Sequence, residues 1–396
     1  MNPTAIPSPY TPGEAPSVLV GRGAQLADAQ ADLALLATYA RFLGRVRVHV
    51  GSRGVGKTSL LKAVRDEATG AGAVVAWVTA RGDESLVAAL VAATARALDD
   101  IGVDISRRTP LRDRLQSLTL ELGAGPASAG VELDVRPAGA PDSGASSAAF
   151  GAFVTAAATA ARERGSAGLC LLIDEIQAAP REDLRTLAYA WQELQQASPE
   201  PAAVVIAAGL PNTPDVLTAA VTFSERFAFR TLERLSRADA AEVLEAPARE
   251  HGVAWRPDLL AEVVDLAQGY PYFLQLYGDA VWREAGPAEG DELGPDLLPR
   301  TRARVDDELA TMFRARWVKA TPGEQRVLGG MAELTGAAED DVRRGALADH
   351  LSLTSNDLSV PRRGLLDKGL IEVAGRGALR FTVPGFAAWI RQETGG

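Results

Sequence analysis

The chain has 396 residues, which is too long for one ordinary hydrophobic core and predicts two or three domains. Its formal net charge of −10 argues against a protein whose whole surface coats nucleic acid, since such binding depends on neutralising phosphates, but it leaves room for a local basic face. With a single cysteine, Cys170, an internal disulfide is impossible. The sequence also shows no long apolar run and no basic, hydrophobic leader, so we expect a cytoplasmic protein that does not contact a membrane.

Strand and helix patterns alternate after a proline-rich segment, residues 1–17, for which we expect an extended arm. Residues 117–135 alternate on both sides of a Gly-Pro turn and predict an inserted hairpin, followed by a flexible linker over 136–147. The strands expected are 45–50, 72–80, 168–175, 201–209 and 227–232. The helices expected are 24–43, 58–68, 84–98, 110–116, 147–164 and 181–197.

Continuous apolar runs such as 168–175 suit strands that are covered on both faces of a parallel sheet. The fold class predicted for residues 18–234 is therefore α/β, a doubly wound parallel sheet. After residue 235 the pattern becomes helical, with no strand pattern before residue 370. Three helices at 236–252, 256–269 and 270–286 and a linking helix at 300–319 predict a helical lid domain over 235–319.

The remaining residues, 320–396, begin with helices expected at 321–334, 345–351 and 354–368. A hairpin with Gly-Arg-Gly at its tip is expected within 371–386. Three helices followed by such a hairpin predict a winged helix.

Residues 51–58, GSRGVGKT, fill every position of the pattern Gly-x-x-x-x-Gly-Lys-[Ser/Thr] between an expected strand and an expected helix. Glycines allow a tight turn whose N–H groups form an anion-binding nest, and the following helix adds its positive end. Lys57 is then expected to reach the β- and γ-phosphates of ATP, and the Thr58 hydroxyl to ligate Mg²⁺. The alternative is a glycine turn capped by Thr58. The residues expected to contact ATP or ADP here are Gly51, Ser52, Arg53, Gly54, Val55, Gly56, Lys57, Thr58 and Ser59.

Two carboxylates end the apolar run GLCLLIDE, where a strand of a nucleotide-binding sheet would meet the phosphate loop. Asp174 is expected to hold Mg²⁺ through water, and Glu175 to polarise an attacking water in phosphoryl transfer. The alternative is a pair of solvated acids at the start of a loop. Cys170, inside the same run, is expected to be a small core residue.

Together these motifs resemble the AAA+ and STAND branch of P-loop ATPases, in particular its origin-recognition/initiator-like, archaeal-type group, over most of residues 18–390. The stretch VLVGRGAQL is similar to the entry motif of that group, which borders the adenine, although Gln25 stands where glutamate is usual. The resemblance implies nucleotide contacts by Val20, Gly21 and Arg22. IDEIQ looks like the group's Walker B variant.

Two further stretches carry the resemblance. FSERFAF is similar to the Ser-Arg-Phe box with a glutamate inserted, which implies that Arg226 is an arginine finger reaching a neighbouring subunit in a homo-oligomer; the alternative is an ordinary ion pair. QGYPYFLQ resembles a Gly-x-Pro motif found where typical AAA+ proteins have a second-sensor arginine. It implies that Tyr270 and Pro271 pack near the nucleotide, against the alternative of a plain helix start. Asn212 or Thr213 is the candidate first sensor, a few residues late.

The segment 354–368 is the candidate element for the major groove of double-stranded DNA. Basic residues exceed acidic ones between 358 and 382, which fits phosphate contact, while a structural or protein-docking role is the alternative. The residues expected to contact nucleic acid are Arg362, Arg363, Lys368 and Arg376, with Arg380 also on the expected wing.

The function predicted is an ATP-binding and ATP-hydrolysing switch that couples nucleotide state to the winged helix. Its catalytic residues would be Lys57, Glu175 and Arg226, with ATP/ADP and Mg²⁺ as cofactors. The alternative is a DNA-binding regulator or protein-docking module in which ATP is mainly a structural ligand. A STAND-type signalling platform is disfavoured because no repeat array follows the expected winged helix.

Overall fold

The computed structural model describes residues 6–104, 143–221, 224–336, 340–375 and 377–394. The helix expected at 110–116, the hairpin expected at 117–135 and Arg376 lie outside the described residues. Of the helices that are described, none combines the length and the apolar character needed to cross a membrane.

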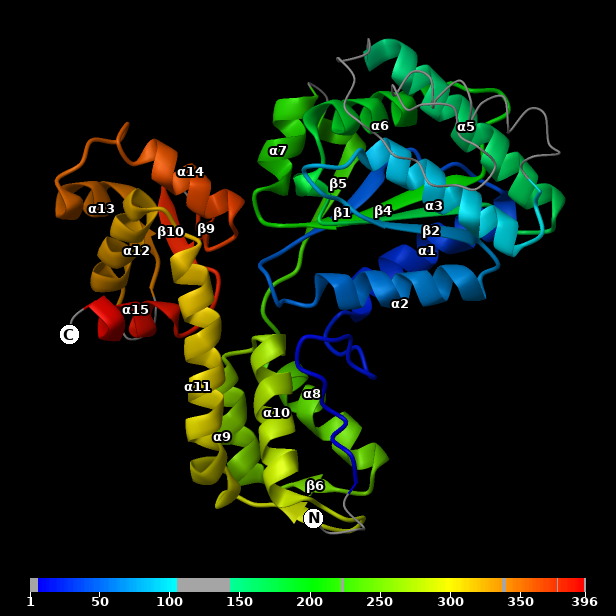
Figure 1. The fold of residues 1–396 in the computed structure, drawn as a ribbon. Coiled ribbons are helices and arrows are strands. Elements are labelled where there is room, and N and C mark those ends of the chain that lie inside the picture. Colours follow the sequence, from blue (N-terminus) through cyan, green and yellow to red (C-terminus); the bar gives the residue numbers. More distant parts are fainter. Residues whose placement is uncertain (1–5, 105–142, 222–223, 337–339, 376, 395–396) are drawn as a thin grey trace.

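A parallel sheet forms the centre of the N-terminal half, as the sequence predicted (Figure 1). Its strands are β1 (Val46–Val50), β2 (Val74–Thr79), β3 (Leu169–Asp174), β4 (Ala203–Gly209) and β5 (Phe227–Thr231), in the order β2-β3-β4-β1-β5. The register pairs Val50 with both Gly209 and Thr231, and Thr79 with Asp174. The carboxyl ends of the strands therefore meet at one edge, where open α/β sheets bind their ligands.

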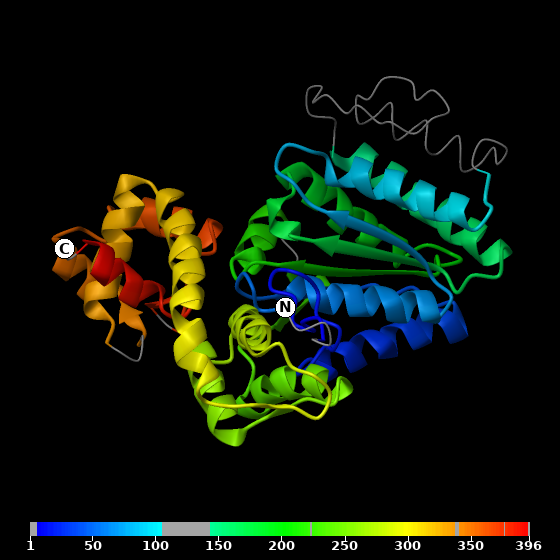
Figure 2. The ribbon, with the colours of Figure 1, turned by 60° about the horizontal axis from the view of Figure 1, so that its bottom comes forward.

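Helices cover both faces of this sheet (Figures 1 and 2). One face carries α1 (Gly23–Tyr39) and α2 (Lys57–Gly70), and the other carries α3 (Leu86–Asp100), α5 (Ser143–Glu163) and α6 (Arg181–Leu194). Along β3, Leu169, Leu171 and Ile173 pack toward α3, α5 and α6, while Cys170 and Leu172 pack toward α1 and α2. Both faces of the strand are thus buried, which explains its unbroken apolar run and places Cys170 in the core.

The chain then crosses to a helical region below the sheet in Figure 1. After α7 (Thr213–Ala220), this region contains α8 (Arg237–Glu250), β6 (Ala254–Trp255), α9 (Pro257–Ala267), α10 (Pro271–Ala285) and β7 (Glu292–Leu293). The long helix α11 (Leu297–Val318) leads to the C-terminal region. There, α12 (Pro322–Leu334), β8 (Val342–Arg343), α13 (Arg344–Leu351), α14 (Ser359–Asp367), β9 (Ile371–Val373), β10 (Ala378–Phe381) and α15 (Phe386–Thr394) follow. β9 and β10 form the expected antiparallel hairpin, and β8 pairs with β10.

Several element predictions were wrong in detail. Strands occur before residue 370, but β6, β7 and β8 each have two residues, too few to show an alternating pattern. The linker expected over 136–147 is helical from Ser143. Neither α7 nor α15 was predicted.

The helix expected at 354–368 begins only at Ser359. The side chains of Thr354 and Asp357 bond to each other at 2.7 Å and to each other's backbone N–H. This local turn competes with the helix for its first residues.

The described part of the proline-rich arm is in no helix or strand, yet it is anchored. It runs along α8 and α10 toward α1 (Figure 1). Tyr10 is 2% exposed; its hydroxyl donates to the Leu244 carbonyl at 2.5 Å and accepts from Trp255 Nε1 at 2.9 Å. Trp282 Nε1 donates to the Ile6 carbonyl at 2.9 Å. The arm is therefore part of the packing of the helical region.

Candidate nucleotide-binding site

The glycine loop after β1 has the backbone geometry that its sequence requires. Gly54 and Gly56 have φ values of +81° and +97°, a region that other residues enter only at a cost. A Cβ at Gly54 would lie 2.6 Å from the Tyr270 hydroxyl oxygen, so the loop also needs glycine for space. Tyr270 donates this hydroxyl to the Arg53 carbonyl, which links the loop to the start of α10.

Lys57 is the first residue of α2, and its side chain folds back into the glycine loop. Its Nζ donates to the carbonyls of Gly51 and Ser52, both at 2.9 Å. Burial lowers the pKa of Lys57 to about 8, and the nearby Glu175 and Asp174 act in the opposite direction. The buried ammonium thus sits where a negatively charged ligand at the loop would compensate for its desolvation.

Thr58 and the carboxyl end of β3 meet beside the loop. The Thr58 hydroxyl donates to Asp174 Oδ2 at 2.7 Å, and the Glu175 N–H donates to Asp174 Oδ1 at 2.9 Å. Burial raises the pKa of Asp174, although the Thr58 hydrogen bond opposes this shift. Glu175 has a φ of +52°, which is unusual for a residue other than glycine.

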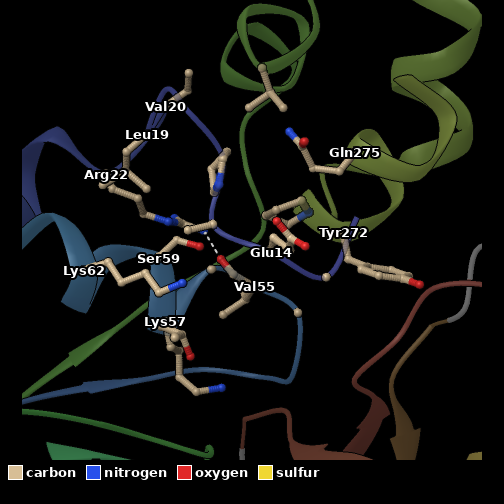
Figure 3. A pocket seen from close by; sticks show the side chains of 18 of the residues that line it. Glu14, Leu19, Val20, Arg22, Val55, Lys57, Ser59, Lys62, Tyr272 and Gln275 are labelled. Carbon is tan, nitrogen blue, oxygen red and sulfur yellow. Dashed lines mark hydrogen bonds between the residues drawn. The ribbon is translucent and has the colours of Figure 1, made fainter. Parts of the chain in front are cut away.

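A cavity of about 320 Å³ opens over the loop (Figure 3). Lys62 and Ser59 from α2 lie on one side of it, and Tyr272 and Gln275 from α10 lie on the other. Arg22 is buried on the same side as Ser59 and Lys62 (Figure 3), and it donates to the carbonyls of Val55 at 2.9 Å and Glu233 at 2.8 Å. Burial lowers the pKa of Arg22. Arg22 therefore ties the entry segment to the loop and to the segment after β5.

Most of the residues expected at the nucleotide come together here. Those that line the cavity are Val20, Arg22, Arg53, Gly54, Val55, Gly56, Lys57, Thr58, Ser59, Glu175 and Pro271. Gly51 and Ser52 instead line a separate cavity of about 820 Å³ between the sheet edge and the hairpin β9–β10. Gly21 packs against Leu235, and Tyr270 lies behind the loop rather than in the cavity lining.

The sequence reasoning missed several lining residues. Glu14 and Pro16 come from the arm, and no local pattern marks them. Lys62, Tyr272 and Gln275 lie on the same helices as residues that were predicted to contact the nucleotide. Gln275 is one helical turn beyond Pro271, so the 3.6-residue period of the helix could have indicated that both face the cavity. Gln275 Oε1 accepts from the Thr11 N–H at 3.0 Å, which joins the arm to the cavity wall.

The comparisons with known proteins agree with this geometry. Residues 18–206 match the family model described as "AAA ATPase domain". These residues are thus similar to an AAA ATPase domain, and we use that name for the whole α/β region, residues 18–234. Residues 310–390 match a domain of unknown function, DUF8462. A comparison with curated proteins found no match.

Several solved structures resemble the whole chain. The ADP form of the Aeropyrum pernix ORC2 protein is 17% identical, with 98% of each chain covered and a TM-score of 0.57. The Aeropyrum pernix ORC1 protein in complex with DNA is 16% identical, covers 97% of this chain and 95% of its own, and has a TM-score of 0.44. The Thermotoga maritima RuvB Holliday junction branch migration motor is 14% identical, with coverages of 92% and 95% and a TM-score of 0.45. The first of these likenesses shows that the chain has an origin-recognition-like fold.

A second cavity, of about 480 Å³, lies where the AAA ATPase domain faces α14. Arg53 and Glu175 line both this cavity and the first one. Across it, Asn212 Nδ2 donates to Asp367 Oδ1 at 2.8 Å, while Asn212 Oδ1 is buried without a hydrogen-bond partner. Asn212, a candidate first sensor, thus contacts the C-terminal region.

Of the residues expected to contact nucleic acid, Arg363 lies at this face. Arg363 lines the second cavity and is 3.9 Å from Asp367. Burial lowers the pKa of Arg362, and Asp215 of the AAA ATPase domain opposes the shift. Lys368 forms an ion pair with the buried Glu324 of α12. Lys368 is therefore turned toward its own domain, whereas the Arg363 side chain is 70% exposed.

Arg226 lies just before β5, at the opposite edge of the sheet from the glycine loop, because β5 runs parallel to β1. Its guanidinium donates to Gln195 Oε1. Arg226 is thus remote from the loop of its own chain, and its action on a neighbouring subunit stays a prediction.

Among the described residues, no group of three or more His, Cys, Asp or Glu side chains is placed to enclose a metal ion. Mg²⁺ is commonly held by one or two protein ligands together with water and phosphate oxygens. Thr58 and Asp174, in mutual contact at the cavity edge, fit that donor set.

Proposed function

We propose that this protein binds ATP with Mg²⁺ in the cavity over the glycine loop and hydrolyses it. The observation that carries the proposal is that Lys57, Thr58 and Glu175 line one cavity while Asp174 bonds to Thr58 beside it. Thr58 and Asp174 meet although they are 116 residues apart in the chain. The match to the AAA ATPase domain model supports it.

Each of these residues has a role that its position supports. Lys57 and the loop N–H groups would bind the β- and γ-phosphates, and Thr58 and Asp174 would hold Mg²⁺, which neutralises charge on the phosphates. Glu175 would accept a proton from the attacking water. The apolar lining from the arm, α8 and α10, which includes Pro16, Val243 and Pro271, would pack against the base.

Calorimetry with Mg-ATP and phosphate release tests the two halves of this proposal. Lys57→Ala should abolish the binding heat, because it removes the buried cation from the loop. Glu175→Gln should keep binding and lower phosphate release by about 100-fold or more, since general bases contribute that much. Binding without any difference between wild type and Glu175→Gln would instead favour ATP as a structural ligand.

We also propose that nucleotide state is coupled to the C-terminal region, and that this region is a winged helix that contacts double-stranded DNA. The supporting observation is the Asn212–Asp367 hydrogen bond, which joins the nucleotide side of the sheet to α14. In this conformation Arg363 lines the cavity between α14 and the AAA ATPase domain but is 70% exposed, and Arg362 is half-buried. DNA contact through both residues would be favoured if α14 and the AAA ATPase domain separated.

Affinity for a DNA duplex at two salt concentrations tests that coupling. Asp367→Ala should strengthen binding by freeing α14, and Arg362→Ala with Arg363→Ala should weaken it and reduce its salt dependence. Equal curves for all variants would exclude this face as the DNA contact. For the homo-oligomer, Arg226→Ala should lower ATP hydrolysis only at concentrations where the protein self-associates.

A further inference from the structure

Gln177 connects Glu175 to the end of a neighbouring strand. It lies in the short 3₁₀ turn Ile176–Ala178 that follows Glu175. Gln177 Nε2 donates to Glu175 Oε2 at 2.5 Å, and Gln177 Oε1 accepts from the Leu210 N–H, just after β4, at 3.0 Å. The Thr213 hydroxyl lies 3.5 Å from the same Oε1. One amide thus bridges the ends of β3 and β4.

The orientation of this amide is fixed by chemistry. A backbone N–H can only donate, so the atom of Gln177 that faces Leu210 must be the carbonyl oxygen. The NH₂ group then faces Glu175, where a carboxylate oxygen can only accept. Both contacts therefore require the same orientation of the Gln177 amide, and rotating the amide by 180° would lose both hydrogen bonds.

The surroundings leave the amide little room. A Cβ at Gly209 would lie 2.6 Å from Gln177 Oε1 and 2.2 Å from the Thr213 hydroxyl oxygen, so glycine is needed at the end of β4. Glu175 itself is held at a φ of +52°. Non-glycine residues persist in this region only where their surroundings determine them, and such positions are typical of functional sites.

We propose that Gln177 is a positioning residue for Glu175. It holds Oε2 of the carboxylate, so Oε1 is the oxygen presented to a water at the nucleotide, and it sets the direction of the side chain at the junction of the two cavities. The inference rests on the proposed ATP hydrolysis. The backbone N–H of Leu210, two residues before Asn212, then helps to position Glu175 through Gln177.

Gln177→Glu is the sharpest variant, because it has the same shape and can still accept from the Leu210 N–H, but in its ionised form it has no donor for Glu175 and places a second negative charge beside it. We expect kcat for ATP to fall by about 10- to 100-fold, as small misplacements of a reacting group do, with KM and Mg-ATP affinity unchanged. Gln177→Leu should give a similar fall. Gln30→Leu, the same change on the exposed side of α1, should have the kinetics of wild type.

The Glu175→Gln background separates positioning from a structural role. If Gln177 acts through Glu175, adding Gln177→Leu to Glu175→Gln should lower the single-turnover rate no further. An equal fractional loss in both backgrounds, or a wild-type kcat in Gln177→Glu, would overturn the inference while leaving the proposed ATPase intact. A wild type that releases no more phosphate than Lys57→Ala would instead refute the hydrolysis itself, and the inference with it.

Discussion

The buried Tyr10 should make the N-terminal arm necessary for both the helical region and the nucleotide cavity. Its ring meets Trp255 and Trp282 edge to face, with centroids 6.2 and 5.8 Å apart, and packs against Gly278, where a Cβ would lie 2.8 Å from it. Three residues further on, the arm begins to line the cavity, with Gly13, Glu14, Ala15 and Pro16. Replacing Tyr10 therefore tests whether this short segment is structural.

The magnitude follows from what the side chain fills. Truncating a buried aromatic residue to alanine costs about 3–5 kcal/mol in the free energy of unfolding. Tyr10→Phe keeps the ring but leaves Trp255 Nε1 and the Leu244 carbonyl without the hydroxyl that pairs them, which costs about 1–3 kcal/mol. Tyr39→Ala makes the same deletion at a residue that is 73% exposed and should change stability by no more than about 0.5 kcal/mol.

Urea unfolding followed by tryptophan fluorescence measures this, because Trp255 and Trp282 touch the Tyr10 ring. The midpoint should fall in the order Tyr39→Ala, Tyr10→Phe, Tyr10→Ala. Mg-ATP affinity at low urea should fall in Tyr10→Ala alone, since the arm would leave the cavity wall. Identical midpoints for Tyr10→Ala and Tyr39→Ala would refute the reasoning.

Three further predictions concern the loop and the sheet. Gly54→Ala should weaken Mg-ATP binding by about tenfold or more in calorimetry, because a Cβ there collides with Tyr270 and the backbone conformation adds a cost of about 1–2 kcal/mol. Gly72→Ala is the control: Gly72 has a φ of +78° and open space around it, so this variant should have the backbone cost alone and bind Mg-ATP normally. Thr58→Ala should bind ATP equally with Mg²⁺ and with EDTA, while Thr58→Ser keeps the dependence on Mg²⁺. Burial, assisted by Arg47, lowers the pKa of His49 from 6.5 to about 4. Between these two pH values His49 is protonated in the unfolded chain but neutral in the folded one, so the free energy of unfolding should fall by about 3 kcal/mol as the pH drops from about 6.5 to 4. His49→Leu should remove that loss in acid-unfolding curves; an unchanged slope would contradict it.

The sequence predicted those parts of the site that are contiguous in the chain. The glycine loop is a run of eight residues, and its strand and helix follow from patterns beside it. Asp174 and Glu175 could be predicted to lie at the same site because they end an apolar run, and the carboxyl ends of parallel strands meet at one edge of the sheet. The sheet was predicted because strand and helix patterns alternate along residues 18–234, and because apolar runs such as 168–175 suit strands buried on both faces.

Contacts between distant segments could not be predicted from those patterns. Asn212 and Asp367 are 155 residues apart, and nothing in either local sequence marks the other as its partner. Tyr10 was placed in an extended arm because prolines dominate that segment; its single aromatic side chain is the signal that it docks. Helix α14 begins late because Thr354 and Asp357 bond locally, an outcome that apolar spacing does not report.

Arg53 shows how these long-range contacts bear on the proposed coupling. Its carbonyl accepts from Tyr270 at the start of α10, and its side chain approaches the backbone of Gly369, where a Cβ would lie 3.8 Å from Arg53 Nε. It also lines both cavities. The loop that would bind a triphosphate is thus hydrogen-bonded to the helical region and lies near the segment after α14. Because Gly54 packs closely against Tyr270, a shift of the loop on nucleotide binding would have to move Tyr270 or the segment after α14. A change at the phosphates could therefore reach α14 directly, without being transmitted along α11.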